Sequence, residues 1–278
     1  MRKMRIVADS SANVLTLAGV PFGCAPLKVI TADREFVDNS QLDLAQMRAY
    51  FSTYSGRSDT SCPGPADWLE AFADGEDIFC VTITSGLSGS YNAACTAAEL
   101  YRGEHPDRRV FVIDSLSAGP ELQLMIEYLR EQILAGYSYE EICCGATAYL
   151  QETGLVFMLE SLKNFAANGR VSPAVAKVAG LLGIRVVGKA SDAGKLEPLH
   201  KCRGEAKSLE AILSSVKAQG LLAGKVRIAH SNNEAAAQKL RRKLLAELPQ
   251  VDVEIVACLG LCSYYAEEGG LLVGFEKK

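Results

Sequence analysis

The sequence predicts an α/β protein, and its first half carries the pattern of a parallel sheet. Short apolar runs at residues 5–8, 78–83 and 110–113 have the length and composition of buried strands. Each run leads into Asp, Ser or Thr and is followed later by a helical pattern. This alternation favours a doubly wound domain with hydroxyl and carboxylate side chains at one edge of the sheet.

The second half has a different pattern. Residues 184–189 and 195–202 read as two strands joined by a tight turn, and helical patterns surround this hairpin. The change places a domain boundary near residue 146. We therefore expect an N-terminal parallel-sheet α/β domain (1–146) and a C-terminal α+β domain with a mixed sheet (147–278), with the ligand between them.

Further elements are expected between these landmarks. In the first half we expect a strand at 25–31 that turns back through 32–34, a helix at 43–52, irregular structure at 60–65 because of its prolines, a helix starting at Pro65, and a helix at 120–134. In the second half we expect strands at 155–159, 226–230, 253–257 and 271–275, and helices at 161–168, 173–182, 205–217 and 233–248.

Composition and charge exclude several classes of protein. The 278 residues are 49% hydrophobic and 22% charged with a net charge of −4, and the basic clusters near Arg102–Arg109 and Arg241–Lys243 lie beside carboxylates in sequence, so we expect no nucleic-acid partner. No apolar run approaches the roughly 20 residues that span a bilayer, and the N-terminus enters a strand directly. We expect a cytoplasmic protein without stable membrane insertion. The nine cysteines show no paired CxxC spacing, which favours free thiols and no metal.

The segment Thr84–Ala94 follows the second apolar run and leads into a helix. Its hydroxyls and two glycines would present side-chain and backbone donors at a helix N-terminus, which favours an anion-binding site. The alternative is an ordinary N-cap with a Ser-rich connection.

Catalytic motifs are missing from this pattern. The glycines around Ser88 do not form a GxSxG elbow, and neither a Walker A loop nor GxGxxG occurs. The three histidines, His105, His200 and His230, lie in a charged loop, in the hairpin and at a strand end. The sequence therefore predicts a binding protein with no catalytic residue and no cofactor.

Four ordered motifs resemble the DegV family over nearly the whole chain. They are Thr60-Ser61-Cys62-Pro63, Ser85-Gly86-Leu87-Ser88-Gly89-Ser90-Tyr91, Leu162–Phe165 with Asn168–Ser172, and the hairpin from Ile184-Arg185 to Lys201-Cys202-Arg203. The resemblance implies a carrier that encloses one long-chain fatty acid between its two domains. It also implies a separate ATP-dependent fatty acid kinase subunit as a possible partner, to which the carboxylate is presented for acyl phosphate formation.

The resemblance also implies the site residues. The carboxylate would be bound by Thr60, Ser61, Ser88, Gly89, Ser90, Arg203 and Tyr265, with Arg203 as the countercharge; without the resemblance Arg203 reads as a surface arginine of the hairpin. Arg170 would tie the domain boundary together or meet the partner. The acyl tunnel would be lined by Phe157, Met158, Leu162, Phe165 and Met125, although each also fits an ordinary core.

One departure from the family leaves a second hypothesis open. Near the C-terminus the family usually has His-Thr-Gly-Pro-Gly, and the matching stretch here is Tyr265-Ala266-Glu267-Glu268-Gly269. A tyrosine donates a hydrogen bond but carries no charge at neutral pH, and a glutamate at this place would repel an anion. The alternative is a stand-alone enzyme or sensor for another acidic amphiphile, with His230 as a further candidate group.

Overall fold

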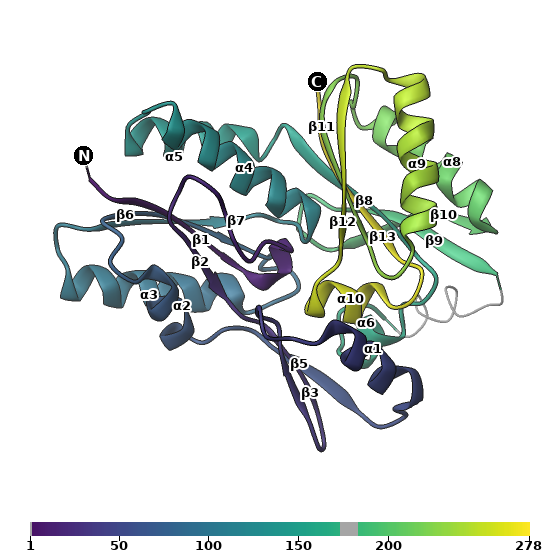
Figure 1. The fold of residues 1–278 in the computed structure, drawn as a ribbon, viewed down its shortest axis with the longest axis horizontal. Helices are drawn as coiled ribbons and strands as arrows, with labels where there is room; N and C mark the ends of the chain where they lie inside the picture. Colours follow the sequence, from purple (N-terminus) through teal and green to yellow (C-terminus); the bar gives the residue numbers. More distant parts are fainter. Residues whose placement is uncertain (1, 173–182) are drawn as a thin grey trace.

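The computed structural model describes residues 2–172 and 183–278 (Figure 1). The helix expected at 173–182 lies outside these residues. Among the helices that are described, none combines the length and the apolar character needed to cross a membrane.

The N-terminal half is built on a four-stranded parallel sheet in the order β2-β1-β6-β7. Its central strand β6 is buried along its whole length, as expected for a parallel sheet covered on both faces. Helices α2 and α3 cover one face and α4 and α5 the other (Figure 1). The elements are β1 (Met4–Asp9), β2 (Phe22–Ala25), β6 (Asp77–Thr82), β7 (Arg109–Asp114), α2 (Pro65–Phe72), α3 (Ser90–Glu104), α4 (Pro120–Leu134) and α5 (Tyr139–Tyr149), with a 3-10 turn η1 (Ser10–Ala12) after β1.

A small antiparallel sheet, in the order β4-β3-β5, corrects two of the expectations. The strand expected at 25–31 is two strands in different sheets, because Pro26, which lacks an N–H to donate to a ladder, separates β2 from β3. Thr60 and Ser61 were expected in irregular structure, yet they belong to β5, since the prolines begin only at Pro63. The elements are β3 (Lys28–Thr31), β4 (Glu35–Val37) and β5 (Ser58–Ser61), with helix α1 (Leu44–Thr53) between β4 and β5 in the chain.

The C-terminal half is built on a six-stranded mixed sheet in the order β10-β9-β8-β13-β11-β12. Neighbouring strands are antiparallel except β11 and β12. Helices α8 and α9 bury their apolar faces on one side of it (Figure 1). The elements are β8 (Thr153–Leu159), β9 (Ile184–Ala190), β10 (Leu196–Arg203), β11 (Gly224–His230), β12 (Val251–Ala257), β13 (Leu271–Glu276), α6 (Lys163–Ala167), α8 (Glu205–Ala218), α9 (Glu234–Glu247) and α10 (Gly260–Ala266). The predicted fold class is confirmed.

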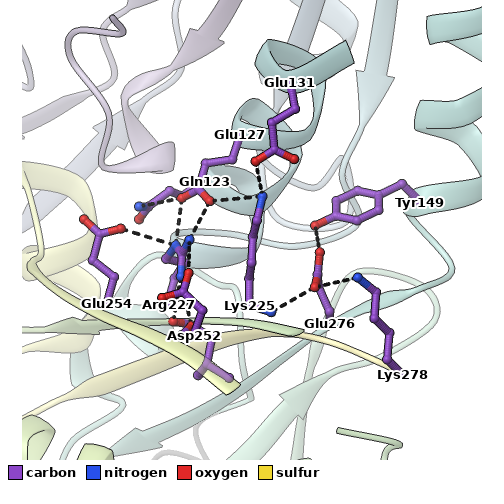
Figure 2. Close-up of polar contacts among 11 residues, drawn as sticks. Gln123, Glu127, Glu131, Tyr149, Lys225, Arg227, Asp252, Glu254, Glu276 and Lys278 are labelled. Carbon is purple, nitrogen blue, oxygen red and sulfur yellow. Dashed lines mark hydrogen bonds and ion pairs between the residues drawn. The ribbon is translucent and has the colours of Figure 1, made fainter. Parts of the chain in front are cut away.

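Helix α4 joins the two halves, because it packs against β1 and β6 on one side and β11 and β13 on the other. Figure 2 shows the polar part of this contact. The Arg227 guanidinium of β11 donates through Nε and Nη2 to the two Glu127 oxygens of α4, at 2.8 Å each, and also reaches Asp252 and Glu254. The Tyr149 hydroxyl of α5 donates to Glu276 of β13 at 2.8 Å. The boundary expected near residue 146 lies inside α5. The helices that pack on the first sheet extend past it to Tyr149.

A second link comes from α10, which the sequence patterns did not predict. Its first two backbone N–H groups, at Gly260 and Leu261, donate to the Asp38 carboxylate at 2.7 and 2.9 Å. Asp38 thus caps a helix that follows it by more than two hundred positions. This contact fixes α10 of the second half against the small sheet of the first.

Candidate functional site

A cavity of about 300 Å³ lies between the two halves of the molecule. Leu27, Ile83 and Leu87 reach it from the N-terminal half, and β8, β10, α10 and β13 supply most of the opposite wall. The apolar lining from the second half includes Leu155, Phe157, Leu159, Phe165, Ala190, Leu196, Leu261, Cys262, Ala266 and Leu272. The cavity therefore lies between the two domains, where the ligand was expected.

Strand β8 forms the floor of the cavity through alternate residues. Leu155, Phe157 and Leu159 face the cavity, whereas Val156 and Met158 face the core beneath α8 and α9. This follows from the two-residue period of a strand, which turns neighbouring side chains to opposite faces. Met158 was expected in the tunnel wall, and the pleat places it on the other side of the sheet.

Polar groups from four elements gather at one end of the cavity. The Thr60 hydroxyl of β5 and the Tyr265 hydroxyl of α10 form a hydrogen bond of 2.7 Å in which either can donate. The Arg170 guanidinium, after α6, lies with its Cζ 6.0 Å from the Tyr265 ring centroid, and its Nε donates to the Leu87 carbonyl at 3.2 Å. Thr60, Arg170 and Tyr265 all line the cavity, together with Ser61, Ser88 and Gly89 of the expected set.

The loop that precedes α3 owes its position to a buried carboxylate. Asp9, at the end of β1, accepts hydrogen bonds from the Ser90 hydroxyl at 2.7 Å and from the Ile83 N–H at 2.8 Å. The Ser90 hydroxyl therefore points at Asp9, and Ser90 does not line the cavity, unlike Ser88 and Gly89. Burial raises the pKa of the Asp9 carboxyl above its ordinary value.

Tyr265 occupies the centre of the polar end. Its ring packs on Phe165, with centroids 4.6 Å apart, and burial raises the pKa of its hydroxyl above 10.0. The hydroxyl is therefore protonated at neutral pH and able to donate. Neither Glu267 nor Glu268 lines the cavity: Glu267 accepts from Ser161 and Asn164, and Glu268 from Asn232. The two carboxylates of the altered loop therefore bond to protein groups and do not face the cavity.

The two arginines lie in different environments, and Arg170 links the two halves as expected through its hydrogen bond to Leu87. Arg203 is exposed at the end of the edge strand β10 and does not line the cavity. Arg170 is half-buried and lines it. Each arginine lies within a motif that resembles the family, so sequence position alone did not show which of them lines the cavity; the packing of Arg170 between Leu87 and Tyr265 does.

The remaining tunnel candidates divide in the same way. Phe157 and Phe165 line the cavity, whereas Met125 lies in the core between α4 and the first sheet. Leu162 is buried in the cluster behind the wall and does not line the cavity. Sequence reasoning missed Leu155, Leu159 and Lys195; the period-two pattern of β8 would have indicated the first two once Phe157 was assigned.

The lining shows what the cavity can do chemically. Arg170 and Lys195 are the charged side chains among its described lining residues, which include no His, Asp or Glu. His230 lies at the end of β11, where its Nδ1 accepts from the Asn233 N–H at 3.3 Å and burial lowers its pKa. An apolar cleft with neutral donors and a guanidinium at one end is suited to hold an amphiphilic anion, and it lacks a carboxylate or imidazole to act as general base among those lining residues.

Comparison with known proteins shows the family of this chain. A family model described as "Uncharacterised protein, DegV family" matches residues 3–278. The chain belongs to the DegV family. A DegV domain-containing protein of Streptococcus pneumoniae is 43% identical over 276 residues, with 98% of each chain covered.

Two solved DegV structures are similar to this chain over their full length. One is a DegV family protein from Eubacterium eligens loaded with heptadecanoic acid, at 45% identity, a TM-score of 0.97 and coverage of 99% of this chain and 100% of that one. The other is the Streptococcus pneumoniae Fatty Acid Kinase (Fak) B3 protein loaded with linoleic acid, at 43% identity, a TM-score of 0.97 and 100% coverage of both chains.

Proposed function

We propose that this DegV protein binds one long-chain fatty acid in the cavity between its two halves. The acyl chain lies along Leu155, Phe157 and Leu159 of β8. The carboxylate lies among Thr60, Ser61, Ser88, Gly89 and Tyr265, with Arg170 as the countercharge in place of Arg203. The supporting observation is that a largely apolar cavity is lined by the hydrogen-bonded hydroxyls of Thr60 and Tyr265, with the Arg170 guanidinium beside them.

The energetics of this ligand favour such a division of roles. A chain of about 16 carbons buried at ~0.8 kcal/mol per CH₂ contributes on the order of 10 kcal/mol before entropic costs, so the apolar wall supplies most of the affinity. The buried carboxylate then needs hydrogen bonds and a partner charge, since an unpaired ion is costly to desolvate. Thr60, Tyr265 and the N-terminus of α3 at Ser88-Gly89 offer the donors, and Arg170 the charge.

We further propose that the protein presents this carboxylate to a separate ATP-using kinase subunit, which transfers a phosphoryl group to form an acyl phosphate. The similarity to the Fak B3 protein and the lack of a general base among the described lining residues support a carrier over a stand-alone enzyme. The alternative of a stand-alone enzyme or sensor has less support, since neither His230 nor Glu267 is among the described residues that line the cavity.

Native mass spectrometry of the freshly purified protein, followed by solvent extraction and lipid analysis, tests this proposal. We expect one co-purified fatty acid per chain. A delipidated sample should then yield acyl phosphate, trapped as a hydroxamate, only when a fatty acid, ATP and a fatty acid kinase subunit are all added. A protein that is ligand-free and takes up neither saturated nor unsaturated long-chain acids would overturn the carrier function.

A further inference from the structure

The cavity floor contains a pair of facing residues, Phe157 of β8 and Gly188 of β9. The two strands are antiparallel, and the register places Phe157 directly opposite Gly188. Directly opposite residues point to the same face of a sheet, so a side chain at position 188 would point toward the cavity, as Phe157 does.

The Phe157 ring occupies the space that such a side chain would need. A Cβ atom at Gly188 would lie 2.4 Å from Cζ and 2.7 Å from Cε2 of Phe157, and 2.6 Å from the Glu197 carbonyl oxygen of β10. The ring therefore packs against the backbone of β9, because residue 188 has no side chain. A ring rotated away from β9 would enter the cavity.

Phe157 also lies in the middle of the cavity floor. Leu159, at one end of the run, belongs to the same cluster as Phe165, which packs on Tyr265 at the polar end. Leu155, at the other end, lies two residues beyond Phe157, near the segment from Ala190 to Leu196 that closes the lining there. At about 3.3 Å per residue the three side chains span roughly 13 Å, with Phe157 midway.

We infer that Gly188, by letting the Phe157 ring lie flat, sets the width of the cavity at its middle and so determines whether a chain bent at mid-length can bind. The inference rests on the proposed fatty-acid function and extends it to the class of acyl chain. A cis double bond bends a chain and needs lateral room, whereas saturated and trans-unsaturated chains remain straight. Gly188 and Phe157 thus act together as specificity-determining residues for cis-unsaturated acids.

Calorimetric titration of delipidated protein with stearic, oleic and elaidic acids tests this. These acids have the same number of carbons, and only oleic acid is bent. We expect Gly188→Ala to weaken oleic acid relative to stearic acid by at least about fivefold, as overpacking of a filled site does, and to leave the elaidic-to-stearic ratio unchanged. Phe157→Leu should shift the oleic-to-stearic ratio the opposite way. In the Phe157→Leu background, Gly188→Ala should change that ratio by less than about twofold, because the ring through which it acts is gone.

Gly154→Ala is the matched control. Gly154 lies on the same strand as Phe157, and a Cβ atom there would meet Cζ of Phe275 at 2.8 Å, in a core outside the cavity lining. This variant should lose stability and keep the wild-type preference among the three acids. Two results would overturn the inference and leave the proposed function intact: an unchanged oleic-to-stearic ratio in folded Gly188→Ala, or an effect of Gly188→Ala that persists in the Phe157→Leu background.

Two further outcomes are equally informative. If Gly188→Ala does not fold because of the Glu197 carbonyl, Phe157→Leu decides by itself, and an unshifted ratio in that variant overturns the inference. If the wild-type protein binds none of the three acids, both the proposed function and the inference fall.

Discussion

The hydroxyls of Thr60 and Tyr265 lie 2.7 Å apart and connect the small sheet of the N-terminal half to α10 of the C-terminal half. Their hydrogen bond closes the polar end of the cavity with side chains that are 205 positions apart. Both residues line the cavity, so the two groups that join the halves also face the cavity. A carboxylate bound as proposed would meet the contact between the halves at this point.

The first prediction concerns the Tyr265 hydroxyl. Tyr265→Phe removes a donor to the carboxylate and keeps the ring that packs on Phe165. We expect the affinity for a fatty acid to fall by about fivefold to tenfold, the value of roughly one net hydrogen bond of ~1 kcal/mol. Calorimetric titration measures the change.

Tyr264→Phe is the control for this variant. The Tyr264 hydroxyl bonds to Ser58 at 2.7 Å and to Asn168 at 3.0 Å, and Tyr264 does not line the cavity. Its loss should lower thermal stability and leave affinity within about twofold. Equal losses of affinity in the two variants would show that Tyr265 acts only by holding α10 in place.

The second prediction separates Arg170 from Arg203. Arg170→Met should weaken binding of a fatty acid by at least about tenfold, because a charge-assisted hydrogen bond contributes roughly 1.5–3 kcal/mol. It should change binding of the corresponding methyl ester much less, since the ester carries no charge to pair. Arg203→Met, at an exposed position outside the lining, should leave both affinities unchanged. If Arg203→Met proves the more damaging, the countercharge has been assigned to the wrong arginine.

Much of this fold follows from local patterns. The apolar runs of β1, β6, β7 and β8 and the periodic helices lie where the sequence predicts them, because burial on one or both faces dictates their composition. The short helix α10 could not be found in this way. Its N-terminal N–H groups are capped by Asp38, which follows the distant strand β4, so no capping side chain precedes Gly260 in sequence.

The candidate site, like the fold, could be predicted from local patterns only in part. Thr60 and Ser88 lie in motifs that resemble the family, Tyr265 lies in the stretch that departs from it, and all three line the cavity. Which side of β8 faces the ligand depends on register, and a shift of one residue separates Phe157 from Met158. Whether Arg170 or Arg203 turns inward depends on packing between the halves, which no local pattern encodes.

The third prediction concerns the ion pair between α4 and β11 in Figure 2. The Arg227 side chain is only 6% exposed, and Glu127 is its bidentate partner. Glu127→Ala leaves the buried guanidinium with the more exposed Asp252 and Glu254, so we expect a loss of about 3 kcal/mol in the free energy of unfolding. Urea denaturation measures it.

A neighbouring glutamate provides the comparison. Glu131 lies on the same helix as Glu127 and pairs with Lys225, but its side chain is 51% exposed, so Glu131→Ala should cost at most about 1 kcal/mol. Similar costs for the two variants would mean that Arg227 does not depend on Glu127, and that the contact between α4 and β11 rests on apolar packing.

The last prediction is a pH dependence that arises from Glu121. This residue, in the first turn of α4, is 7% exposed and accepts a hydrogen bond of 2.8 Å from the Thr153 hydroxyl. Burial is the largest effect on its carboxyl and raises the pKa above the ordinary value of 4.5. The folded protein therefore retains the proton to a higher pH than the unfolded chain does, and stability decreases as the pH rises from about 4.5 through the folded-state pKa.

Glu121→Gln removes this titration and preserves an acceptor for Thr153. We expect the Glu121→Gln variant to become progressively more stable relative to the wild type as the pH rises above 4.5, with the difference levelling off once the wild-type carboxyl is ionised. Urea denaturation of the variant and wild-type proteins at matched pH values gives this difference directly. A difference that does not vary with pH, or one that favours the wild type more strongly at higher pH, would show that the folded-state pKa of Glu121 is not raised.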